Sequence, residues 1–304
     1  MNGCDGSVMM HVVLDRVFPL IETDATPGIA KLLNGQIARS ELVAGGLTNT
    51  LRRVELTDGR VIGVKQFVQG TSFATEEAAL RKFAGVLPVP EILCTSDRVI
   101  AYRWIEGVTL DECRRRTPWA LAALAAPLGR LLGRLLGGPL GGPPARTRRD
   151  IPPVDLTPTF AQLDHGLVQS RLGASLAWTV RRLLSAHRFD DPMCFVHGDF
   201  SAKNVLVAPS LDRIAGVIDW EAATTGSVLR DVGSLFRFAN CYDAAFRAAF
   251  ARVHGHLPTD WFERARLLDT TQMIATLAEE RDLPIVHYEL CNVVAQIAAS
   301  PYRR

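Results

Sequence analysis

Residues 194–221 read CFVHGDFSAKNVLVAPSLDRIAGVIDWE, the densest group of polar residues in an apolar setting in this chain. Two short apolar runs within it, residues 205–207 and 214–218, flank a turn and predict a small β-hairpin. Asn204 directly precedes the first strand and Asp219 directly follows the second, so the hairpin brings an amide oxygen and a carboxylate together. A few hard oxygen ligands that leave room for phosphate oxygens are typical of Mg²⁺ sites in phosphoryl transfer. The stretch therefore predicts a magnesium site at the ends of this hairpin.

Asp199 is the third candidate of this segment, because it stands five residues before Asn204 on the connecting loop. Taken one by one, these residues are also typical of a turn, a strand start and a strand end. Their joint order, H-G-D-x-x-x-x-N followed by I-D-W-E, is far more specific. It resembles the catalytic segment of the aminoglycoside phosphotransferase and choline kinase-like family, relatives of the protein kinases. The resemblance implies that Asp199 aligns an acceptor hydroxyl and takes its proton late, while Asn204 and Asp219 hold Mg²⁺.

The same resemblance implies an α+β fold of the bilobal, protein-kinase-like type, and the pattern along the chain agrees. Strand-like runs joined by an Asp58-Gly59 turn, with one helix over residues 73–84, predict a small antiparallel sheet. We assign this sheet to an N-terminal nucleotide-binding lobe, residues 1–105. Residues 106–304 predict a larger, mostly helical C-terminal lobe.

The C-terminal lobe contains three segments of interest, namely the catalytic loop 197–204, the metal segment 218–221 and a Gly/Pro-rich loop over 137–158. Helices are expected at 171–188, 228–239, 260–281 and 286–299. Thr117-Pro118 is typical of a helix start, and Pro127 is expected to break or kink the helix that follows.

Residues 45–50, GGLTNT, resemble the turn that covers the nucleotide phosphates between the first two strands in this family. A glycine at position 46 lets backbone N–H groups approach phosphates. The resemblance therefore implies nucleotide contacts at Gly46, Thr48 and Asn49. The sequence of residues 45–50 departs from the protein-kinase G-x-G-x-x-G pattern.

Lys65 lies inside the apolar run VIGVKQF, where a buried ammonium is costly unless it is paired. The resemblance assigns Lys65 to the nucleotide phosphates and pairs it with a glutamate of the next helix. The family's glutamate-containing helix pattern, matched onto residues 77–80 (EAAL), makes Glu77 the expected partner, and its place three residues before Leu80, near the buried face, agrees with this choice. Glu76, about 100° away around the helix, is the alternative partner. A solvent-facing lysine on an edge strand is the other interpretation.

Residues 101–110, AYRWIEGVTL, are similar to the segment that links the lobes in this family. By that resemblance the Arg103 carbonyl and the Ile105 amide hold adenine or guanine, and Tyr102 is the gatekeeper. An ordinary strand end is the alternative interpretation.

Three further residues are expected to support the catalytic loop. His197 is expected to support the loop backbone rather than to act as a general base. Asp231 resembles the family aspartate that anchors the loop, although capping of a helix start is a comparable interpretation. Lys203 either neutralises the transferring phosphoryl group or is a solvated loop lysine.

Composition excludes several classes of function. The 304 residues are 48% hydrophobic and carry a net charge of +2, which is too near neutral for a nucleic-acid partner. The six scattered cysteines form no metal or redox motif and fit reduced thiols in a cytoplasmic protein. The most apolar stretch, 119–140, contains Arg130 and Arg134, so we expect no membrane span, and the N-terminus shows no clean signal peptide.

Together these patterns predict a small-molecule kinase, a phosphotransferase with an alcohol acceptor that uses ATP or GTP and the cofactor Mg²⁺. An antibiotic-type acceptor, and hence antibiotic resistance, is slightly favoured because the Arg-rich, Lys-poor composition is typical of high-GC bacterial genes. A kinase of a primary metabolite and a nucleotide-binding pseudokinase module are the alternatives. A protein kinase is disfavoured, because Trp220-Glu221 stands where Phe-Gly would be expected. A small-molecule substrate is the expected partner, and monomer and dimer both stay open.

Overall fold

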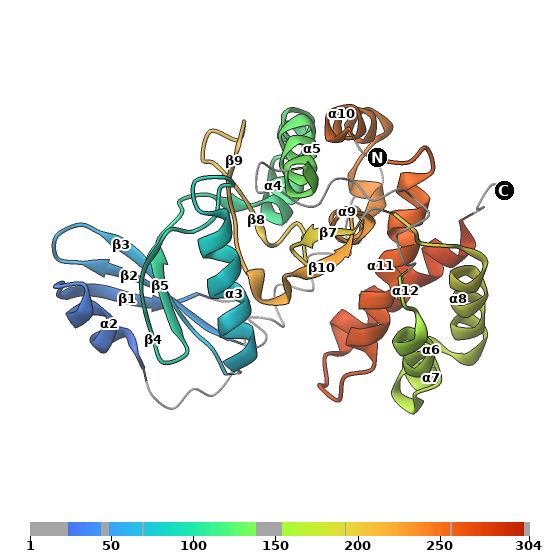
Figure 1. Cartoon of the computed structure of the whole chain (residues 1–304), viewed down its shortest axis with the longest axis horizontal. Coiled ribbons are helices and arrows are strands. Elements are labelled where there is room, and N and C mark those ends of the chain that lie inside the picture. Colours follow the sequence, from blue (N-terminus) through green and yellow to red (C-terminus); the bar gives the residue numbers. More distant parts are fainter. Residues whose placement is uncertain are drawn as a thin grey trace. The chain divides into compact units, whose positions relative to one another are not determined.

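The computed structural model describes residues 24–43, 49–68, 70–137, 154–191, 193–255 and 257–300. Contacts between residues divide the chain into two compact units, whose elements are drawn in Figure 1. Unit 1 consists of Met1–Ala120 and Lys203–Ala223, and unit 2 of Leu121–Ala202 and Thr224–Arg304. The chain therefore passes from one unit to the other inside the expected catalytic loop. The division into lobes at residue 105 stays a prediction.

Unit 1 is built on a five-stranded antiparallel sheet with the strand order β1-β2-β3-β5-β4. The strands are β1 (Ile37–Leu42), β2 (Thr50–Leu56), β3 (Val61–Gln66), β4 (Ile92–Ser96) and β5 (Val99–Arg103). The predicted turn between β2 and β3 is present, and Gly59 adopts a φ of +85°, which glycine tolerates because it has no Cβ. Consecutive residues of β3 and β5 are buried, so both faces of these strands are covered.

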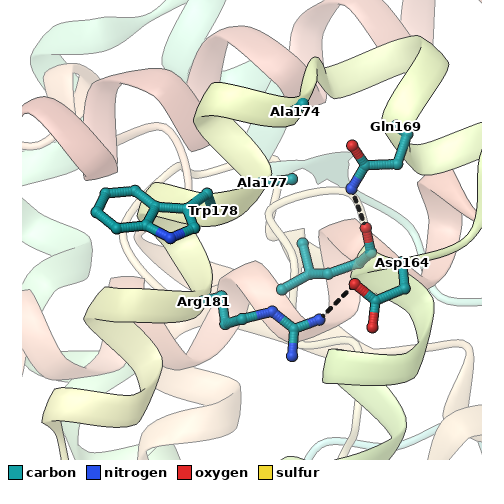
Figure 2. A pocket seen from close by; sticks show the side chains of 7 residues that line it. Asp164, Gln169, Ala174, Ala177, Trp178 and Arg181 are labelled. Atoms are coloured by element: carbon teal, nitrogen blue, oxygen red, sulfur yellow. Dashed lines mark hydrogen bonds and ion pairs between the residues drawn. The ribbon is translucent and has the colours of Figure 1, made fainter.

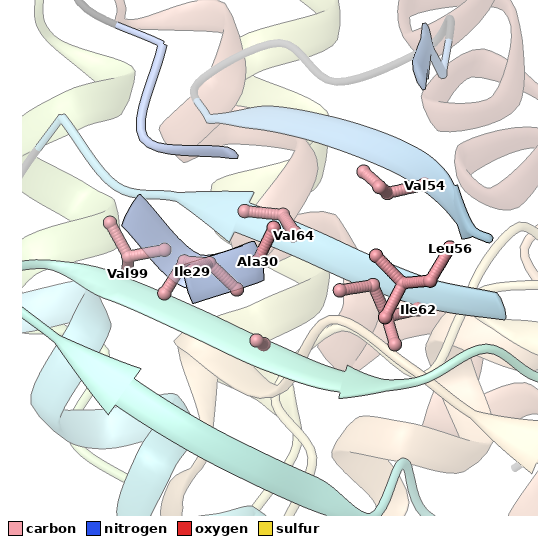
Figure 3. Packing of buried hydrophobic residues seen from close by; sticks show 8 residues of the cluster. Ile29, Ala30, Val54, Leu56, Ile62, Val64 and Val99 are labelled. Carbon is pink, nitrogen blue, oxygen red and sulfur yellow. The ribbon is translucent and has the colours of Figure 1, made fainter. Parts of the chain in front are cut away.

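Two helices pack on this sheet. The first, α2 (Thr26–Leu32), buries Ile29 and Ala30 in the apolar cluster shown in Figure 3. The strand residues of that cluster are Val54, Leu56, Ile62, Val64, Val99 and Ala101. The second helix, α3 (Gly70–Phe83), confirms the helix predicted over 73–84 and begins three residues earlier.

A second, three-stranded sheet completes unit 1, with the order β6-β8-β9. Its strands are β6 (Val108–Thr109), β8 (Val205–Val207) and β9 (Ile214–Val217). The antiparallel β8–β9 pair is the predicted hairpin, which is thereby confirmed. Unit 1 also holds α4 (Leu110–Arg116) and two short 3₁₀ helices, η2 (Pro118–Ala120) and η3 (Trp220–Ala222).

Unit 2 is mostly helical and contains one two-stranded antiparallel sheet, β7 (Met193–Val196) with β10 (Thr224–Ser227). Its helices are α5 (Leu121–Gly137), α6 (Thr157–Leu163), α7 (Gly166–Leu172), α8 (Ala174–Ala186), α9 (Leu229–Leu235), η4 (Ala239–Cys241), α10 (Ala244–His254), α11 (Trp261–Leu277) and α12 (Pro284–Ala299). Helices α5 and α10 approach closely, because a Cβ at Gly129 would lie only 2.4 Å from the Phe250 carbonyl oxygen. The expected break at Pro127 is wrong, since α5 continues through it. The fully buried Leu124 and Leu128 on either side show that packing outweighs the lost hydrogen bond.

The α+β prediction is confirmed, with the five-stranded antiparallel sheet in one unit and most helices in the other. Within the described ranges, no helix has the length and apolar character that crossing a membrane requires. Most of the Gly/Pro-rich loop predicted over 137–158 lies outside the described residues.

Candidate active site

A buried lysine surrounded by carboxylates is the main polar feature of unit 1. Lys65 of β3 is only 7% exposed. Its Nζ lies 2.6 Å from Glu76 Oε2 and 2.5 Å from Asp219 Oδ1, and 3.9 Å from Glu221 Oε2. The four side chains come from a strand, a helix and the segment after β9, so residues far apart in sequence converge on one ammonium. We call these four residues the lysine cluster.

The expected Lys65–Glu77 pair is wrong, and Glu76 takes its place. Glu77 instead accepts hydrogen bonds from Arg81, one turn further along α3, at 2.8–3.1 Å. The buried face of α3 is centred on Ala79, Leu80 and Phe83. Glu76 precedes these residues by three, four and seven positions, so it shares their face and points inward. Glu77 lies at the edge of that face.

The lysine cluster carries more negative than positive charge, since one ammonium faces three carboxylates. Burial by itself would lower the pKa of Lys65, but Asp219, Glu76 and Glu221 outweigh it and raise that pKa. Burial raises the pKa of Glu76 to about 7, against the attraction of Lys65. Burial likewise raises the pKa of the Tyr102 phenol. The cluster thus holds a charged lysine and an excess of carboxylate charge.

The β8–β9 hairpin positions the metal segment as predicted. Val205 pairs with Val217, and the Ile218 N–H donates to the Asn204 carbonyl at 2.9 Å, so the two strand ends do meet. Asp219 adopts a left-handed backbone with φ of 67° and ψ of 59°, a conformation that aspartate tolerates better than most residues. The meeting of the two strand ends is therefore confirmed, while the convergence of the Asn204 amide with the Asp219 carboxylate and their role as metal ligands stay predictions.

Trp220, which stands between Asp219 and Glu221 in the sequence, fixes the metal segment 218–221 to the core. The indole is fully buried, packs against Phe83 of α3 with ring centroids 5.1 Å apart, and donates from Nε1 to the Val217 carbonyl at 2.9 Å. With Trp220 fixed inside the core, Asp219 and Glu221 on either side are held near Lys65.

The Asn49 side chain makes two hydrogen bonds within the protein. Its Oδ1 accepts from the Val68 N–H at 3.1 Å, and its Nδ2 donates to the Glu221 carboxylate. The other two residues expected to cover the phosphates, Gly46 and Thr48, lie outside the described residues. A nucleotide contact at any of the three stays a prediction.

The linker residues lie at the end of β5, where Arg103 is the last residue of the strand. Its N–H donates to the Glu91 carbonyl at 2.9 Å, and its side chain pairs with the Glu91 carboxylate at 2.7 Å. The Ile105 side chain packs over Gly216, where a Cβ would lie 2.6 Å from Cδ1. Binding of a base by these two backbones stays a prediction.

The part of the catalytic loop that belongs to unit 2 is held by hydrogen bonds to α9. Asp231 of α9 accepts from the backbone N–H groups of His197 at 2.7 Å and Gly198 at 2.9 Å. His197 is fully buried, and its Nδ1 accepts from the Asp199 N–H at 3.3 Å. Burial raises the pKa of Asp231. His197 and Asp231 thus make the loop contacts expected of supporting residues, and their effect on activity stays a prediction.

Asp199 itself is partly buried, and its Oδ1 accepts from the Ser234 hydroxyl of α9 at 3.4 Å. Gln272 of α11 donates to the Gly198 carbonyl one residue earlier. Lys203, near the end of the loop, is half-buried in a turn, and its role stays a prediction.

Several residues of these surroundings were missed by sequence reasoning, namely Glu221, Ser234, Arg237 and Gln272. Glu221 had a usable signal, because it lies two residues after Asp219 in the metal segment 218–221, and the two carboxylates come within 4.8 Å of one another. Ser234 and Gln272 come from α9 and α11, and Arg237 lies two residues after α9; nothing in their local sequence distinguishes these three residues.

The donor set of the lysine cluster fits Mg²⁺. The carboxylate oxygens of Glu76, Asp219 and Glu221 lie within 4.8 Å of one another. They are the hard oxygen ligands that Mg²⁺ prefers, and their excess negative charge favours a divalent cation.

Unit 2 contains a cavity of about 200 Å³ (Figure 2). It is formed around α8, with Trp178 on one side and the Arg181–Asp164 ion pair, 2.7 Å long, on another. None of the predicted site residues lines it, so we do not assign it to the active site.

The solved structures that this chain resembles are small-molecule phosphotransferases. A macrolide 2′-phosphotransferase from Brachybacterium faecium is 17% identical, with a TM-score of 0.64 over 93% of this chain and 100% of that one. An aminoglycoside 2′-phosphotransferase-IIIa, solved with GDP, is 19% identical, with a TM-score of 0.66 over 90% of this chain and 97% of that one. These matches confirm the predicted protein-kinase-like fold.

Matches to curated proteins are short. The acyl-CoA dehydrogenase family member 11 of Rattus norvegicus is 38% identical over 61 residues, which cover 20% of this chain and 7% of that protein. The chain thus matches less than a tenth of the length of this relative. A family model described as the phosphotransferase enzyme family matches residues 40–268, three quarters of the sequence. The resemblance seen in the catalytic segment is therefore confirmed, and the chain belongs to the phosphotransferase enzyme family.

Proposed function

We propose that this protein transfers the γ-phosphate of ATP or GTP to a hydroxyl group of a small molecule. The observation that carries the proposal is Lys65, buried and charged among three carboxylates in excess of its own charge. A structural ion pair needs one carboxylate, whereas a site for a metal–triphosphate complex needs both a cation for the phosphates and spare carboxylates for the metal.

The residues of unit 1 would bind the nucleotide. Lys65, held by Glu76, would donate to the phosphates, and Asn204 and Asp219 would hold Mg²⁺ with Glu221 close by. Bound there, Mg²⁺ supplies charge neutralisation for the phosphate oxygens. Gly46, Thr48, Asn49, Arg103 and Ile105 remain the proposed contacts of the rest of the nucleotide.

Asp199 in unit 2 would orient the acceptor hydroxyl and accept its proton. Phosphoryl transfer has a loose transition state, so positioning and charge neutralisation account for most of the acceleration. A rigid loop serves that requirement, and Asp231 and His197 hold this loop through three hydrogen bonds. Lys203, beside Asn204, would neutralise the transferring group.

For the acceptor we propose an antibiotic-type molecule, supported by the macrolide and aminoglycoside phosphotransferases among the similar structures. A metabolite kinase is the second candidate, and the positively charged Arg237 guanidinium, which interacts electrostatically with Asp199, favours it. A cytoplasmic location belongs to the proposal, supported by five cysteines that are free thiols within the described residues.

The test of the reaction is Asp199→Asn, with the exposed turn variant Asp212→Asn as the matched control. We expect Asp199→Asn to keep nucleotide binding in a thermal-shift assay while turnover falls about 10²- to 10⁴-fold. Acceptors would be supplied as a panel with ATP and with GTP, and mass spectrometry would detect the added phosphate. Unchanged turnover in Asp199→Asn would remove this residue from the mechanism. Nucleotide binding without phosphorylation or hydrolysis in the wild type would favour the pseudokinase instead.

A further inference from the structure

Arg237, two residues after the end of α9, is held rigidly by α11. Its Nε and Nη2 donate to the two carboxylate oxygens of Asp269, both at 2.8 Å. The Asp269 side chain is fully buried, whereas the Arg237 side chain keeps 17% of its surface exposed. This two-point pairing fixes the plane of the guanidinium as well as its position.

The pairing leaves one side of the guanidinium unused. A guanidinium has five N–H groups, and the contacts with Asp269 engage only Nε and Nη2. Gln272 lies 3.5 Å from the same Nη2. Among the residues that the structure describes, nothing accepts a hydrogen bond from Nη1. Arg237 is therefore a fixed cation on a partly exposed side chain, with donors that no described residue engages.

Arg237 belongs to the surroundings of Asp199. Ser234, three residues before Arg237, donates to Asp199 Oδ1, and Gln272, beside Arg237, donates to the Gly198 carbonyl. Burial by itself would lower the pKa of Arg237, but Asp269 and, after it, Asp199 raise that pKa. The charges of Arg237 and Asp199 thus act on each other within one hydrogen-bonded frame.

The charge balance there disfavours a polyamine. Among the described residues, the carboxylates that act on Arg237 are those of Asp199 and Asp269, and the Asp269 carboxylate is fully buried and used in the pair. An acceptor with ammonium groups next to its hydroxyl would bring them toward a fixed guanidinium. An acceptor with a carboxylate or carbonyl oxygen at that place would instead accept from Nη1.

We propose that Arg237 is an acceptor-binding, specificity-determining residue that selects hydroxylated molecules with a carboxylate or carbonyl oxygen close to the reactive hydroxyl. This inference rests on the proposed function. In this arrangement Asp269 positions the guanidinium, and Asp199 orients the neighbouring hydroxyl of the acceptor.

The test uses two sets of probes with matched carbon skeletons. One set is lactate, lactamide and 1-amino-2-propanol, and the other is 3-hydroxybutyrate, 3-hydroxybutyramide and 4-amino-2-butanol. Each set presents one hydroxyl beside a carboxylate, a carbonyl or an ammonium group. We expect kcat/KM of the full-length enzyme to favour the carboxylate or amide over the amine by tenfold or more. The better of these two arms identifies which oxygen is recognised.

The variants Arg237→Gln and Arg237→Lys separate recognition from stability. Arg237→Gln should remove the preference, chiefly through a raised KM for the oxygen-bearing probes, and Arg237→Lys should restore part of it. Because Arg237→Gln leaves Asp269 buried without its partner, the double variant Arg237→Gln/Asp269→Asn is included. The matched control is Arg264→Gln/Asp191→Asn, which removes another buried pair of 2.8 Å in unit 2. It should lower the unfolding temperature and leave the preference intact.

Preference of the wild type for the amines would overturn the inference. So would a fall in kcat/KM that is the same for all six probes and the same in the double variant Arg237→Gln/Asp269→Asn as in the control variant. If the enzyme phosphorylated an aminoglycoside but none of the six probes, this inference would be overturned and the proposed function would stand. Absence of turnover with both the probes and the antibiotics would count against the proposed function as well.

Discussion

Each unit of this protein pairs a cation with carboxylates, but the two sites differ in charge balance. In unit 1 a single ammonium, that of Lys65, faces Glu76, Asp219 and Glu221. In unit 2 the Arg237 guanidinium is matched by the single buried carboxylate of Asp269. The lysine cluster therefore has negative charge to spare, and the arginine pair has none.

The chemistry of the two cations makes the difference meaningful. Lysine presents a compact charge on a flexible stem and can exchange partners, whereas a paired guanidinium keeps its plane. We interpret the lysine cluster as a place that receives a metal and phosphates, and the arginine pair as a fixed donor. The following predictions test this contrast.

Removing a carboxylate from the cluster should have the largest effect. We expect Asp219→Asn to lower turnover about 10²- to 10³-fold and to raise the Mg²⁺ concentration needed for half-maximal rate, because the excess charge that attracts the ion is reduced. Initial rates over a Mg²⁺ titration, with a chelator-treated sample as the zero point, measure this. Arg237→Gln/Asp269→Asn, which changes the balanced pair, should leave the Mg²⁺ dependence unaltered. The same Mg²⁺ dependence in Asp219→Asn and wild type would contradict the assignment.

Replacing each of the two neighbouring glutamates of α3 in turn should have smaller effects on activity, and the two variants should differ clearly in their KM for the nucleotide. Glu76→Gln is expected to raise the KM for the nucleotide about tenfold, equivalent to about 1.4 kcal/mol, because Lys65 loses the partner that orients it. Glu77→Gln removes only a helix-surface pair with Arg81, worth about 0.3–0.5 kcal/mol of stability. Steady-state kinetics with varied nucleotide distinguish them. A larger effect in Glu77→Gln would restore the partner expected from the sequence.

The smallest expected effect is a pH dependence of stability that originates at Glu76. Its pKa is about 7 in the folded protein against an ordinary 4.5, so the folded state binds a proton that the unfolded state releases between these values. The resulting stabilisation is present at low pH and is lost as pH rises through about 7. Unfolding temperatures measured from pH 5.5 to 8 should therefore fall more steeply in wild type than in Glu76→Gln. Parallel curves would show that Glu76 does not titrate in this range.

The local sequence was sufficient to predict the β8–β9 hairpin, because the contacts within a hairpin are local. The β8–β9 hairpin and the meeting of its two strand ends followed from two apolar runs and one turn, because register in a hairpin fixes which residues face each other. The choice between Glu76 and Glu77 did not follow, since it depends on how α3 is rotated against the sheet. That rotation is set by Trp220 under Phe83, a contact between residues 137 positions apart in the sequence.

By itself, the sequence determined the family and the α+β class, because those depend on residue types and short spacings. Only the tertiary structure decided which glutamate holds Lys65, that Asn49 binds Glu221, and that Arg237 stands in the electrostatic surroundings of Asp199. The physical reason is that side-chain partners across elements are chosen by helix rotation and by packing of the core. Neither is encoded in a local pattern, and both emerge only when distant segments are buried together.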